Sequence, residues 1–439
     1  MKHFIAIRHE DKGPWEKRTP LIPADVRDII QNHPLEIWVQ PSSVRIFPDE
    51  DYLRVGAKIG KDLTPCPMIL AIKEIPLHFF EREKIYLFFS HTIKGQSHNM
   101  AMLKKMVDLR CTLIEYEKIE NEKGQRLLFF GKQAGQAGMI DTLWALGQRL
   151  AWEGKKTPFS SIKQAYLYQS LAEAEKEIDE VGKKIQQYGL DLSLVPLVCG
   201  FTGYGHVSQG AQEIFDVFPG EEIAPEEIQS LFEKKRNSHM KVYKVVFKEE
   251  HMVEPISSDQ KFDLKDYYKN PQKYRSIFES YLPFLTVLVN CIYWAPEYPR
   301  FVTKRYLKQL YEMNDDPTLR VIGDITCDIE GSIECTVKAT SIENPVFVYD
   351  PIKDEINDGV EGKGPVIMSI DNLPAEIPLE SSISFSKALK PMVPILARAN
   401  FSGDFEQCQL PMALKRAVIL YKGEFTPDFE YMKDFIKNL

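Results

Sequence analysis

Residues 192–218 read LSLVPLVCGFTGYGHVSQGAQEIFDVF, an apolar run that leads into a glycine-rich turn and then into apolar residues at helical spacing. The first part predicts a strand and the last part a helix. Gly203 and Gly205 permit a tight turn and a close approach of the backbone to a ligand, and a pyrophosphate can rest on the free N–H groups of the helix N-terminus. The order of strand, turn and helix therefore predicts a dinucleotide-binding site.

The match to the dinucleotide fingerprint is imperfect, because Ser208 stands at the third glycine position and Gly210 comes two residues later. The alternative is an incidental strand–helix turn. The acidic residue expected about 20 positions further on, which would bind a ribose hydroxyl, is Glu221 or Glu222. Cations that could instead meet a 2′-phosphate, or simply form a solvated face, follow at Lys234, Lys235 and Arg236. These residues leave the choice between NAD and NADP open.

The chain has 439 residues, which predicts two domains of ordinary size. In its first part short apolar runs alternate with helical patterns, which favours a parallel sheet in an α/β domain. Helical patterns recur at residues 135–152 and 171–188, and we expect the first of these helices to bridge the two domains. Residues 221–280 are charged and show little periodicity, so we expect an insertion or an elaborated crossover there. The strand-like runs are HFIAIR, EIWVQ, PMILAIK, YLFFS and CTLIEYE.

Composition narrows the function classes. A net charge of −8 argues against general binding to nucleic acid or to anionic lipid. Seven scattered cysteines without a CxxC pair indicate neither a disulfide framework nor a metal site. The longest apolar stretch, residues 281–294, is shorter than the ~20 residues of a membrane-spanning helix, and the N-terminus lacks a signal-peptide core. We therefore expect a soluble, cytoplasmic protein.

Two ionisable residues follow strand-like runs. Lys73 ends the run PMILAIK, and His91 follows YLFFS. Strand ends of an α/β sheet face a crevice, and a histidine exchanges protons near neutral pH. Taken singly, a strand-end lysine more often extends into water and such a histidine is more often structural. Two such strand ends in one sheet favour a shared cleft.

Further charged residues lie in turns beside these strands. Arg18, in a loop with Glu16 after the first strand, has the planar fork that suits a carboxylate. Glu117 and Arg126 flank another strand–turn unit, and each of these four residues taken alone is an ordinary surface charge.

Taken in order, these segments resemble the lysine–ketoglutarate reductase family, also called saccharopine dehydrogenase (lysine-forming). The resemblance spans nearly the whole chain. It is most specific in the motifs His-Thr-Ile-Lys and Ile-Asp-Asn-Leu-Pro. The similar pieces are EKRTPL (16–21), AIKE (71–74), FSHTIKGQ (89–96), YEK (116–118), FGKQAGQAG (130–138), GYGHVSQGA (203–211), NCIYW (290–294) and SIDNLP (369–374).

Residues 266–274, DYYKNPQKY, are similar to the reductase half of the two-part enzymes of animals and plants, and they are absent from the shorter fungal type. Because the chain ends where that half would end, we expect the saccharopine-oxidising half to be missing and to be a separate enzyme. The resemblance implies two Rossmann-like α/β domains with parallel sheets flanking an active-site cleft. They are an alanine-dehydrogenase-like substrate domain, 1–135 with about 380–439, and an NAD(P)-binding domain, 136–379.

The resemblance also implies the roles of individual residues. Lys73 and His91 match the acid–base pair. The residues that match the substrate site are Glu16, Arg18, Lys94, Glu117 and Arg126. The residues that match the cofactor site are Gly203, Tyr204, Gly205, His206, Val207, Ser208, Asn290, Ile292, Tyr293 and Asp371. No metal is implied.

The implied reaction condenses L-lysine with 2-oxoglutarate, and a hydride reduces the resulting imine to saccharopine. Likeness to the animal type favours NADP(H), with NAD(H) as the alternative, and Ala224 after the expected second strand leans the same way because it offers no carboxylate to a 2′-hydroxyl. Two other functions stay open. One is a related opine-type or alanine-dehydrogenase-like oxidoreductase, and the other is a dinucleotide-binding regulator without catalysis.

Overall fold

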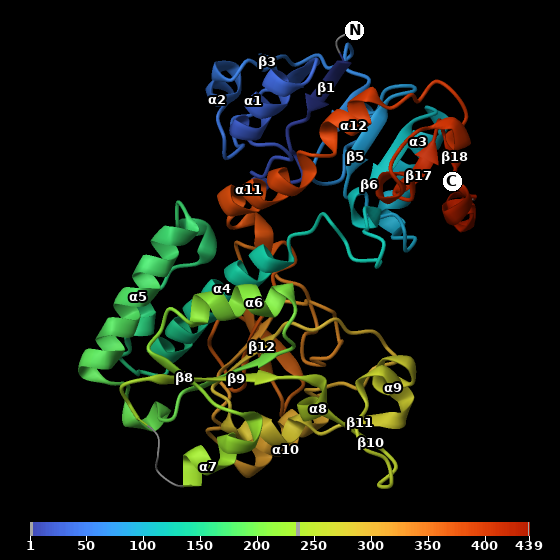
Figure 1. Cartoon of the computed structure of the whole chain (residues 1–439). Helices are drawn as coiled ribbons and strands as arrows, with labels where there is room; N and C mark the ends of the chain where they lie inside the picture. Colours follow the sequence, from blue (N-terminus) through green and yellow to red (C-terminus); the bar gives the residue numbers. More distant parts are fainter. Residues whose placement is uncertain (1–2, 234–237, 438) are drawn as a thin grey trace. The chain divides into compact units, whose positions relative to one another are not determined.

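The computed structural model describes residues 3–233, 238–437 and 439, and it forms two α/β units (Figure 1). The first unit is Met1–Phe130 with Pro378–Leu439, and the second is Gly131–Ile377. Each has an eight-stranded, mostly parallel sheet, so the predicted fold class is confirmed. The expected domain bounds, 1–135 with about 380–439 and 136–379, stay a prediction, because compact units need not fold independently.

The sheet of the first unit has the order β18-β17-β6-β5-β4-β1-β2-β3. Strands β1 to β6 are parallel, whereas β17 is antiparallel to β6 and β18 is antiparallel to β17. The strands are β1 His3–Ile7, β2 Leu35–Val39, β3 Lys58–Ile59, β4 Met68–Leu70, β5 Ile85–Phe88, β6 Thr112–Glu115, β17 Val418–Tyr421 and β18 Glu424–Phe425. All five strand-like runs predicted in residues 1–135 lie in this sheet.

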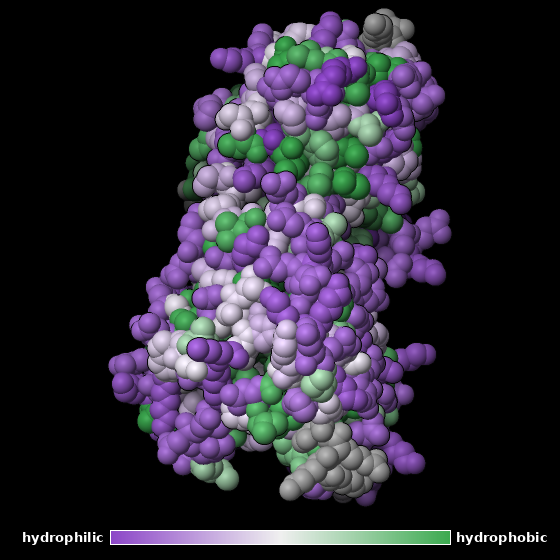
Figure 2. All heavy atoms as spheres, turned by 90° about the vertical axis from the view of Figure 1, so that its left-hand side faces the viewer, coloured by the Kyte–Doolittle hydropathy of each residue, from purple (hydrophilic) through white to green (hydrophobic). Residues whose placement is uncertain are grey.

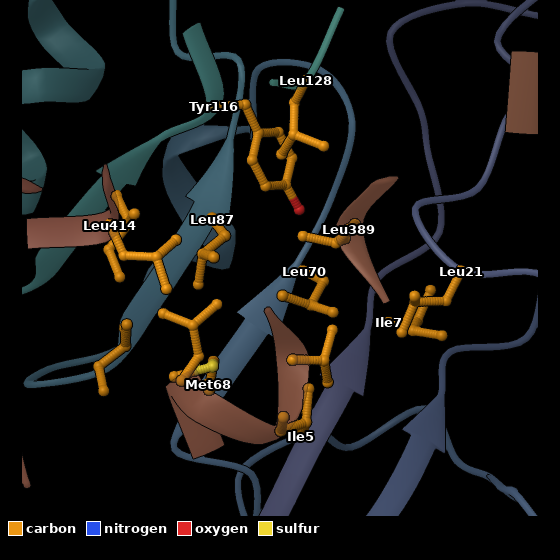
Figure 3. Close-up of a cluster of buried hydrophobic side chains, with 14 of the residues drawn as sticks. Ile5, Ile7, Leu21, Met68, Leu70, Leu87, Tyr116, Leu128, Leu389 and Leu414 are labelled. Carbon is orange, nitrogen blue, oxygen red and sulfur yellow. The ribbon is translucent and has the colours of Figure 1, made fainter. Parts of the chain in front are cut away.

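Helices of both chain ends cover this sheet. Figure 3 shows Leu389 of α11 and Leu414 of α13 in one apolar cluster with Leu70 and Leu87 of the central strands. This burial removes apolar surface from water and joins the C-terminal segment to the N-terminal sheet. The helices are α1 Pro23–Asn32, α2 Asp49–Arg54, α3 Ser97–Asp108, α11 Pro378–Leu389, α12 Val393–Arg398, α13 Met412–Lys415 and α14 Lys433–Ile436.

The sheet of the second unit has the order β15-β14-β16-β13-β12-β7-β9-β8. Its strands are parallel except β14, which is antiparallel to both of its neighbours. The strands are β7 Val198–Thr202, β8 Gly220–Glu222, β9 Val242–Phe247, β12 Val287–Asn290, β13 Val321–Asp324, β14 Val346–Asp350, β15 Glu355–Asp358 and β16 Val366–Met368. The predicted strand, turn and helix at residues 192–218 become β7, the turn and α6 (His206–Phe215).

The expected insertion at residues 221–280 is wrong for its first part. β8 lies at the sheet edge, and β9 pairs directly with β7 over five residues, with Thr202 opposite Phe247. All but one of the β9 residues are buried, and buried strands of parallel sheets lack the alternation that marks a half-exposed strand. The part after β9 is an elaborated crossover to β12. It contains α8 Glu249–Met252, β10 Val253–Pro255, α9 Leu264–Lys269 and β11 Tyr274–Ser276.

The helix predicted at residues 135–152 begins earlier, and α4 spans Gly131–Trp152. It packs against α6 through two glycines. A Cβ atom at Gly135 would lie 1.9 Å from the Val207 carbonyl oxygen, and one at Gly210 would lie 2.1 Å from the Lys132 carbonyl oxygen. Gly210 therefore supplies the close packing for which the fingerprint uses its third glycine. The other helices of this unit are α5 Leu171–Tyr188, α7 Ile228–Glu233 and α10 Lys304–Met313.

None of the helices in the described residues is long and apolar enough to cross a bilayer. The face drawn in Figure 2 is covered mostly by hydrophilic residues, with the hydrophobic ones in separate patches.

Candidate active site

Lys73 and His91 follow neighbouring parallel strands of the first unit. Lys73 comes after β4 and His91 after β5, with Leu70 opposite Leu87 in the register. The carboxyl ends of parallel strands meet at one edge of a sheet, which is where ligands bind in such folds. The structure thus places the two predicted acid–base residues at the same edge.

The Lys73 amine is in an environment that favours its neutral form. Burial lowers its pKa below the ordinary lysine value, and the positive charges of Arg18 and Lys12 lower it further. A lysine amine becomes a useful proton acceptor when such neighbours bring its pKa down.

Glu10, which the sequence did not single out, holds the backbone of Lys73. Its carboxylate is buried and accepts hydrogen bonds from the N–H groups of Ile72 at 2.7 Å and Lys73 at 3.0 Å. Burial, with repulsion from Glu16, raises the pKa of Glu10 to about 7. This carboxylate positions the strand end that carries Lys73.

His91 is held by a carboxylate and by a constrained backbone. Its Nδ1 lies 2.7 Å from Oε1 of Glu74, whose Oε2 pairs with the Lys12 ammonium at 2.7 Å. The backbone of His91 is left-handed, with φ +48°, which is rare outside glycine. The Asn99 amide donates to the His91 carbonyl at 3.2 Å, and the buried Glu115 carboxylate accepts from the Ser90 N–H at 2.8 Å.

Glu74, Lys12, Asn99 and Glu115 were missed by reasoning from the sequence. The signal for Glu74 was its place next to Lys73, in the AIKE segment. Burial of Glu115 as the last residue of an apolar strand is a tertiary property that the sequence pattern does not carry.

The predicted substrate residues form two ion pairs. Arg18 and Glu16 are both buried, and the guanidinium donates from Nε to Oε1 at 2.7 Å and from Nη2 to Oε2 at 2.5 Å. The carboxylate that the Arg18 fork holds in this structure is therefore that of Glu16. Arg126 pairs with Glu117, and Lys94 is exposed.

In the second unit, the glycine-rich turn has the shape of a phosphate cradle. Gly203 has φ +77°, and a Cβ there would lie 2.9 Å from Cγ2 of Ile292, so glycine is required. A Cβ at Gly205, the N-cap of α6, would meet no atom within 4 Å. Gly205 and His206, at this helix start, are exposed, so a pyrophosphate can approach the backbone there.

A cavity of about 270 Å³ adjoins this turn. It is lined by residues 203–205 of the turn, 249 and 252 after β9, 267 and 268 of α9, 291–294 after β12, and 298 and 301. The predicted cofactor residues among them are Gly203, Tyr204, Gly205, Ile292 and Tyr293. Glu249 and the tyrosines of α9 were missed, because they lie far from the turn in the sequence.

The other predicted cofactor residues lie outside the cavity lining. Ser208 is buried and accepts a hydrogen bond from the Gln212 amide at 2.9 Å. Asn290 is buried, and it donates to Asp324 at 2.8 Å and accepts from Thr202 at 2.8 Å, so it braces three strand ends. His206 and Val207 form the first turn of α6, and Asp371 is exposed after β16 at the same sheet edge.

Within residues 3–233, 238–437 and 439, no three His, Cys, Asp or Glu side chains are grouped so that they could hold a metal ion. The three cations expected at Lys234, Lys235 and Arg236 lie outside the described residues.

The chain is similar to known proteins along its length. Residues 6–137 match the family described as alanine dehydrogenase/PNT, N-terminal domain. An alpha-aminoadipic semialdehyde synthase of Arabidopsis thaliana is 40% identical over 99% of this chain and 42% of the relative. The mitochondrial protein of that name from Mus musculus is 34% identical over 98% of this chain and 48% of the relative. This chain thus spans less than half the length of these two relatives.

A shorter relative and two solved structures match over most of both chains. The saccharopine dehydrogenase [NAD(+), L-lysine-forming] of Emericella nidulans is 26% identical over 88% of this chain and 90% of the relative. An L-alanine dehydrogenase structure has a TM-score of 0.63 at 15% identity and covers 99% of both chains. A transhydrogenase from Sinorhizobium meliloti has a TM-score of 0.56 at 14% identity, over 97% of this chain and 100% of that one. The two structures establish likeness of fold.

Proposed function

Because this chain is similar over most of its length to the lysine-forming saccharopine dehydrogenases and to part of the alpha-aminoadipic semialdehyde synthases, we propose that it belongs to their family and condenses L-lysine with 2-oxoglutarate to saccharopine, reversibly. It is an oxidoreductase of the CH–NH class. The observation that carries this proposal is the placement of Lys73 and His91 after β4 and β5, with Glu74 bonded to the imidazole.

The condensation needs proton transfers at two centres. The ε-amine of lysine must lose a proton before it attacks the ketone carbon, and the carbinolamine oxygen must gain one before it leaves as water. An amine of lowered pKa at Lys73 takes the first proton, and His91 delivers the second. Both groups then return to their starting states through proton exchange with solvent.

The dicarboxylate substrate is bound by cations of the same unit. Arg18 has the fork that matches a carboxylate, and its present partner Glu16 keeps it oriented in a buried position. Arg126 and the exposed Lys94 are proposed for a second carboxylate, with Glu117 holding Arg126. A substrate carboxylate at Arg18 has to compete with Glu16, or share the guanidinium with it.

The reduced nicotinamide dinucleotide supplies the hydride when it is bound. The residues that fit it are the left-handed Gly203, the open Gly205 and the N–H groups of His206 and Val207 at the start of α6. Tyr204, Ile292 and Tyr293 line the adjoining cavity. Ser208 and Asn290, which the resemblance also implies, act in this proposal by supporting the turn and the strand ends, and the exposed Asp371 is proposed as a cofactor contact.

The choice of dinucleotide is left open by the comparisons. Likeness to the two-part enzymes favours NADP(H), whereas NAD(+) stands in the names of the fungal relatives. The prediction that Ala224 favours NADP(H) is wrong. Ala224 follows β8, and β8 is the edge strand, which β9 separates from β7 and the glycine-rich turn.

The test is oxidation of the reduced dinucleotide, followed by absorbance, with L-lysine and 2-oxoglutarate present together and then singly. Saccharopine should accumulate only with both, as detected by mass spectrometry. Activity with another amine or keto acid would favour an opine-type oxidoreductase instead. Ammonia-dependent reduction of pyruvate would favour an alanine-dehydrogenase-like enzyme.

A regulator without catalysis is the second candidate function. It would bind the dinucleotide with no turnover for any substrate pair, and a Lys73→Met, His91→Gln variant would keep its physiological effect.

For the reductase, we also propose a cytoplasmic location and a separate saccharopine-oxidising enzyme. The mouse relative is named mitochondrial.

A further inference from the structure

The strand beside the glycine-rich turn comes from an unexpected part of the chain. β9 pairs with β7 along the whole length of β7, and the Gly203 N–H donates to the Phe247 carbonyl oxygen at 2.9 Å. The residues that follow Phe247 therefore lie directly beside the turn. In dinucleotide-binding folds this neighbouring strand end meets the adenosine ribose. The usual spacing of about 20 residues is lengthened here because β8 and α7 come first.

Glu249 occupies that strand end and lines the cavity beside Gly203 and Gly205. Among the described residues of the lining, it is the one with a formally charged side chain. The Tyr268 hydroxyl of α9 donates to Oε1 of Glu249 at 2.5 Å, and the Tyr204 hydroxyl also contacts this carboxylate. The two phenols thereby hold and orient the Glu249 side chain in the cavity.

The two acidic residues that the sequence pattern predicted for binding the ribose hydroxyl, Glu221 and Glu222, form ion pairs outside the cavity. Glu221 and Glu222 belong to the edge strand β8, where Glu221 pairs with Lys241 and Glu222 lies 2.8 Å from the Lys244 ammonium. They tie β8 to β9. Neither lines the cavity.

Among the described residues, the cationic neighbours of Glu249 in the chain, Lys248 and His251, lie outside the cavity lining. His251 accepts a hydrogen bond from the Lys248 N–H at 3.0 Å, and its Nε2 lies 3.6 Å from Glu226 and 3.9 Å from Glu250. The Lys248 side chain is exposed, and neither it nor His251 lines the cavity. A phosphate entering here would meet a carboxylate first.

We propose that Glu249 selects NAD(H) over NADP(H), by accepting hydrogen bonds from the adenosine ribose hydroxyls and repelling a 2′-phosphate. The inference rests on the proposed function for the reaction, but it concerns binding alone. A carboxylate repels a phosphate dianion placed beside it, and the described lining of the cavity contains no cation that would offset this repulsion. The proposal also gives α9 a role, because α9 supplies Tyr268, which holds Glu249.

The experiment measures the dissociation constants of ADP-ribose and 2′-phospho-ADP-ribose by calorimetry, on the full chain without lysine or 2-oxoglutarate. These probes lack the nicotinamide, so the result does not depend on turnover. We expect ADP-ribose to bind at least about tenfold more tightly. Glu249→Gln, which keeps the size of the side chain, should reduce this ratio about tenfold, and Tyr268→Phe should reduce it less.

Glu250→Gln is the matched control, since Glu250 neighbours Glu249 but does not line the cavity, and its ratio should equal that of the unaltered protein. Tighter binding of 2′-phospho-ADP-ribose than of ADP-ribose would overturn the proposal, especially if Lys248→Ala removed that preference. An unchanged ratio of the two dissociation constants in Glu249→Gln would overturn it too. Variants are compared only where circular dichroism shows the native spectrum. Tighter binding of ADP-ribose without formation of saccharopine would contradict the proposed reaction, but it would still support the role of Glu249.

Discussion

The Nδ1 atom of His91 lies 2.7 Å from Oε1 of Glu74, so the imidazole of the proposed proton donor is held by an acid that neighbours Lys73 in the chain. A carboxylate partner keeps the proton on Nδ1 and turns Nε2 outward for exchange. Burial raises the pKa of Glu74, but hydrogen bonds from His91 and Lys12 outweigh it, so the pKa lies below its ordinary value. Glu74 is therefore ionised at neutral pH.

Replacing Glu74 by Gln should lower kcat about tenfold or more with little change in KM, because the amide is a weaker partner for Nδ1 and orients the imidazole less well. Steady-state kinetics with lysine and 2-oxoglutarate measure this. The exposed acid Glu50 is the control, and Glu50→Gln should behave as the unaltered protein. Equal losses in both variants, or a change in KM alone, would contradict the orienting role of Glu74.

Lys73→Met should lower kcat by about 10²–10⁴-fold, because the amine that takes the substrate proton is gone. Dinucleotide binding should stay within about twofold of normal, since the glycine-rich turn belongs to the other unit. Turnover and fluorescence titration with the reduced dinucleotide measure the two effects. Lys61→Met, at an exposed lysine, serves as control. Weakened dinucleotide binding in Lys73→Met would mean that this lysine has another role.

Local patterns were enough to predict β7, the turn and α6, because apolar strands, glycines and helical periodicity act over a few residues. Local patterns also predicted that Lys73 and His91 follow the ends of strands, because both strands are recognisable from their apolar residues. The neighbour of β7 could not be predicted in this way. The rule that places an acid about 20 residues after the turn assumes that the next strand pairs with the first, whereas here β8 is displaced to the edge.

Residues that act through burial were also missed. Glu10 accepts two backbone N–H groups at the end of β4, and its sequence neighbours give no sign of this. The segment MALKRAVILY, which has an amphipathic pattern, divides into α13 and β17, because pairing of β17 with β6 prevails over local helix preference. Both are tertiary effects.

Gly135→Ala should destabilise the second unit by about 2 kcal/mol, because the added Cβ would lie 1.9 Å from the Val207 carbonyl oxygen in the α4–α6 contact. It should also weaken dinucleotide binding, since Val207 belongs to the first turn of α6. Thermal unfolding and calorimetric titration measure these effects. Gly13→Ala is the matched control, because a Cβ there would meet nothing within 4 Å. Equal stability of the two variants would show that the two helices separate without cost.

The buried carboxyl groups of Asp141 and Glu376 should make the second unit less stable as the pH rises. Burial raises the pKa of Asp141 to about 6, and burial with repulsion from Asp141 raises the pKa of Glu376 well above its ordinary value. A raised acid pKa means that the folded state binds more protons than the unfolded state. The stabilisation is therefore complete below about pH 4 and is lost as the pH rises through about 6 and beyond.

Asp141→Asn removes one of these titrating groups and the repulsion on the other. Its midpoint of thermal unfolding should therefore fall less than that of the unaltered protein between about pH 5 and about pH 8. Differential scanning calorimetry at a series of pH values measures the difference. Glu312→Gln, at an exposed acid of α10, should follow the unaltered protein at every pH. If Asp141→Asn follows it as well, these two carboxyl groups contribute nothing to this pH dependence.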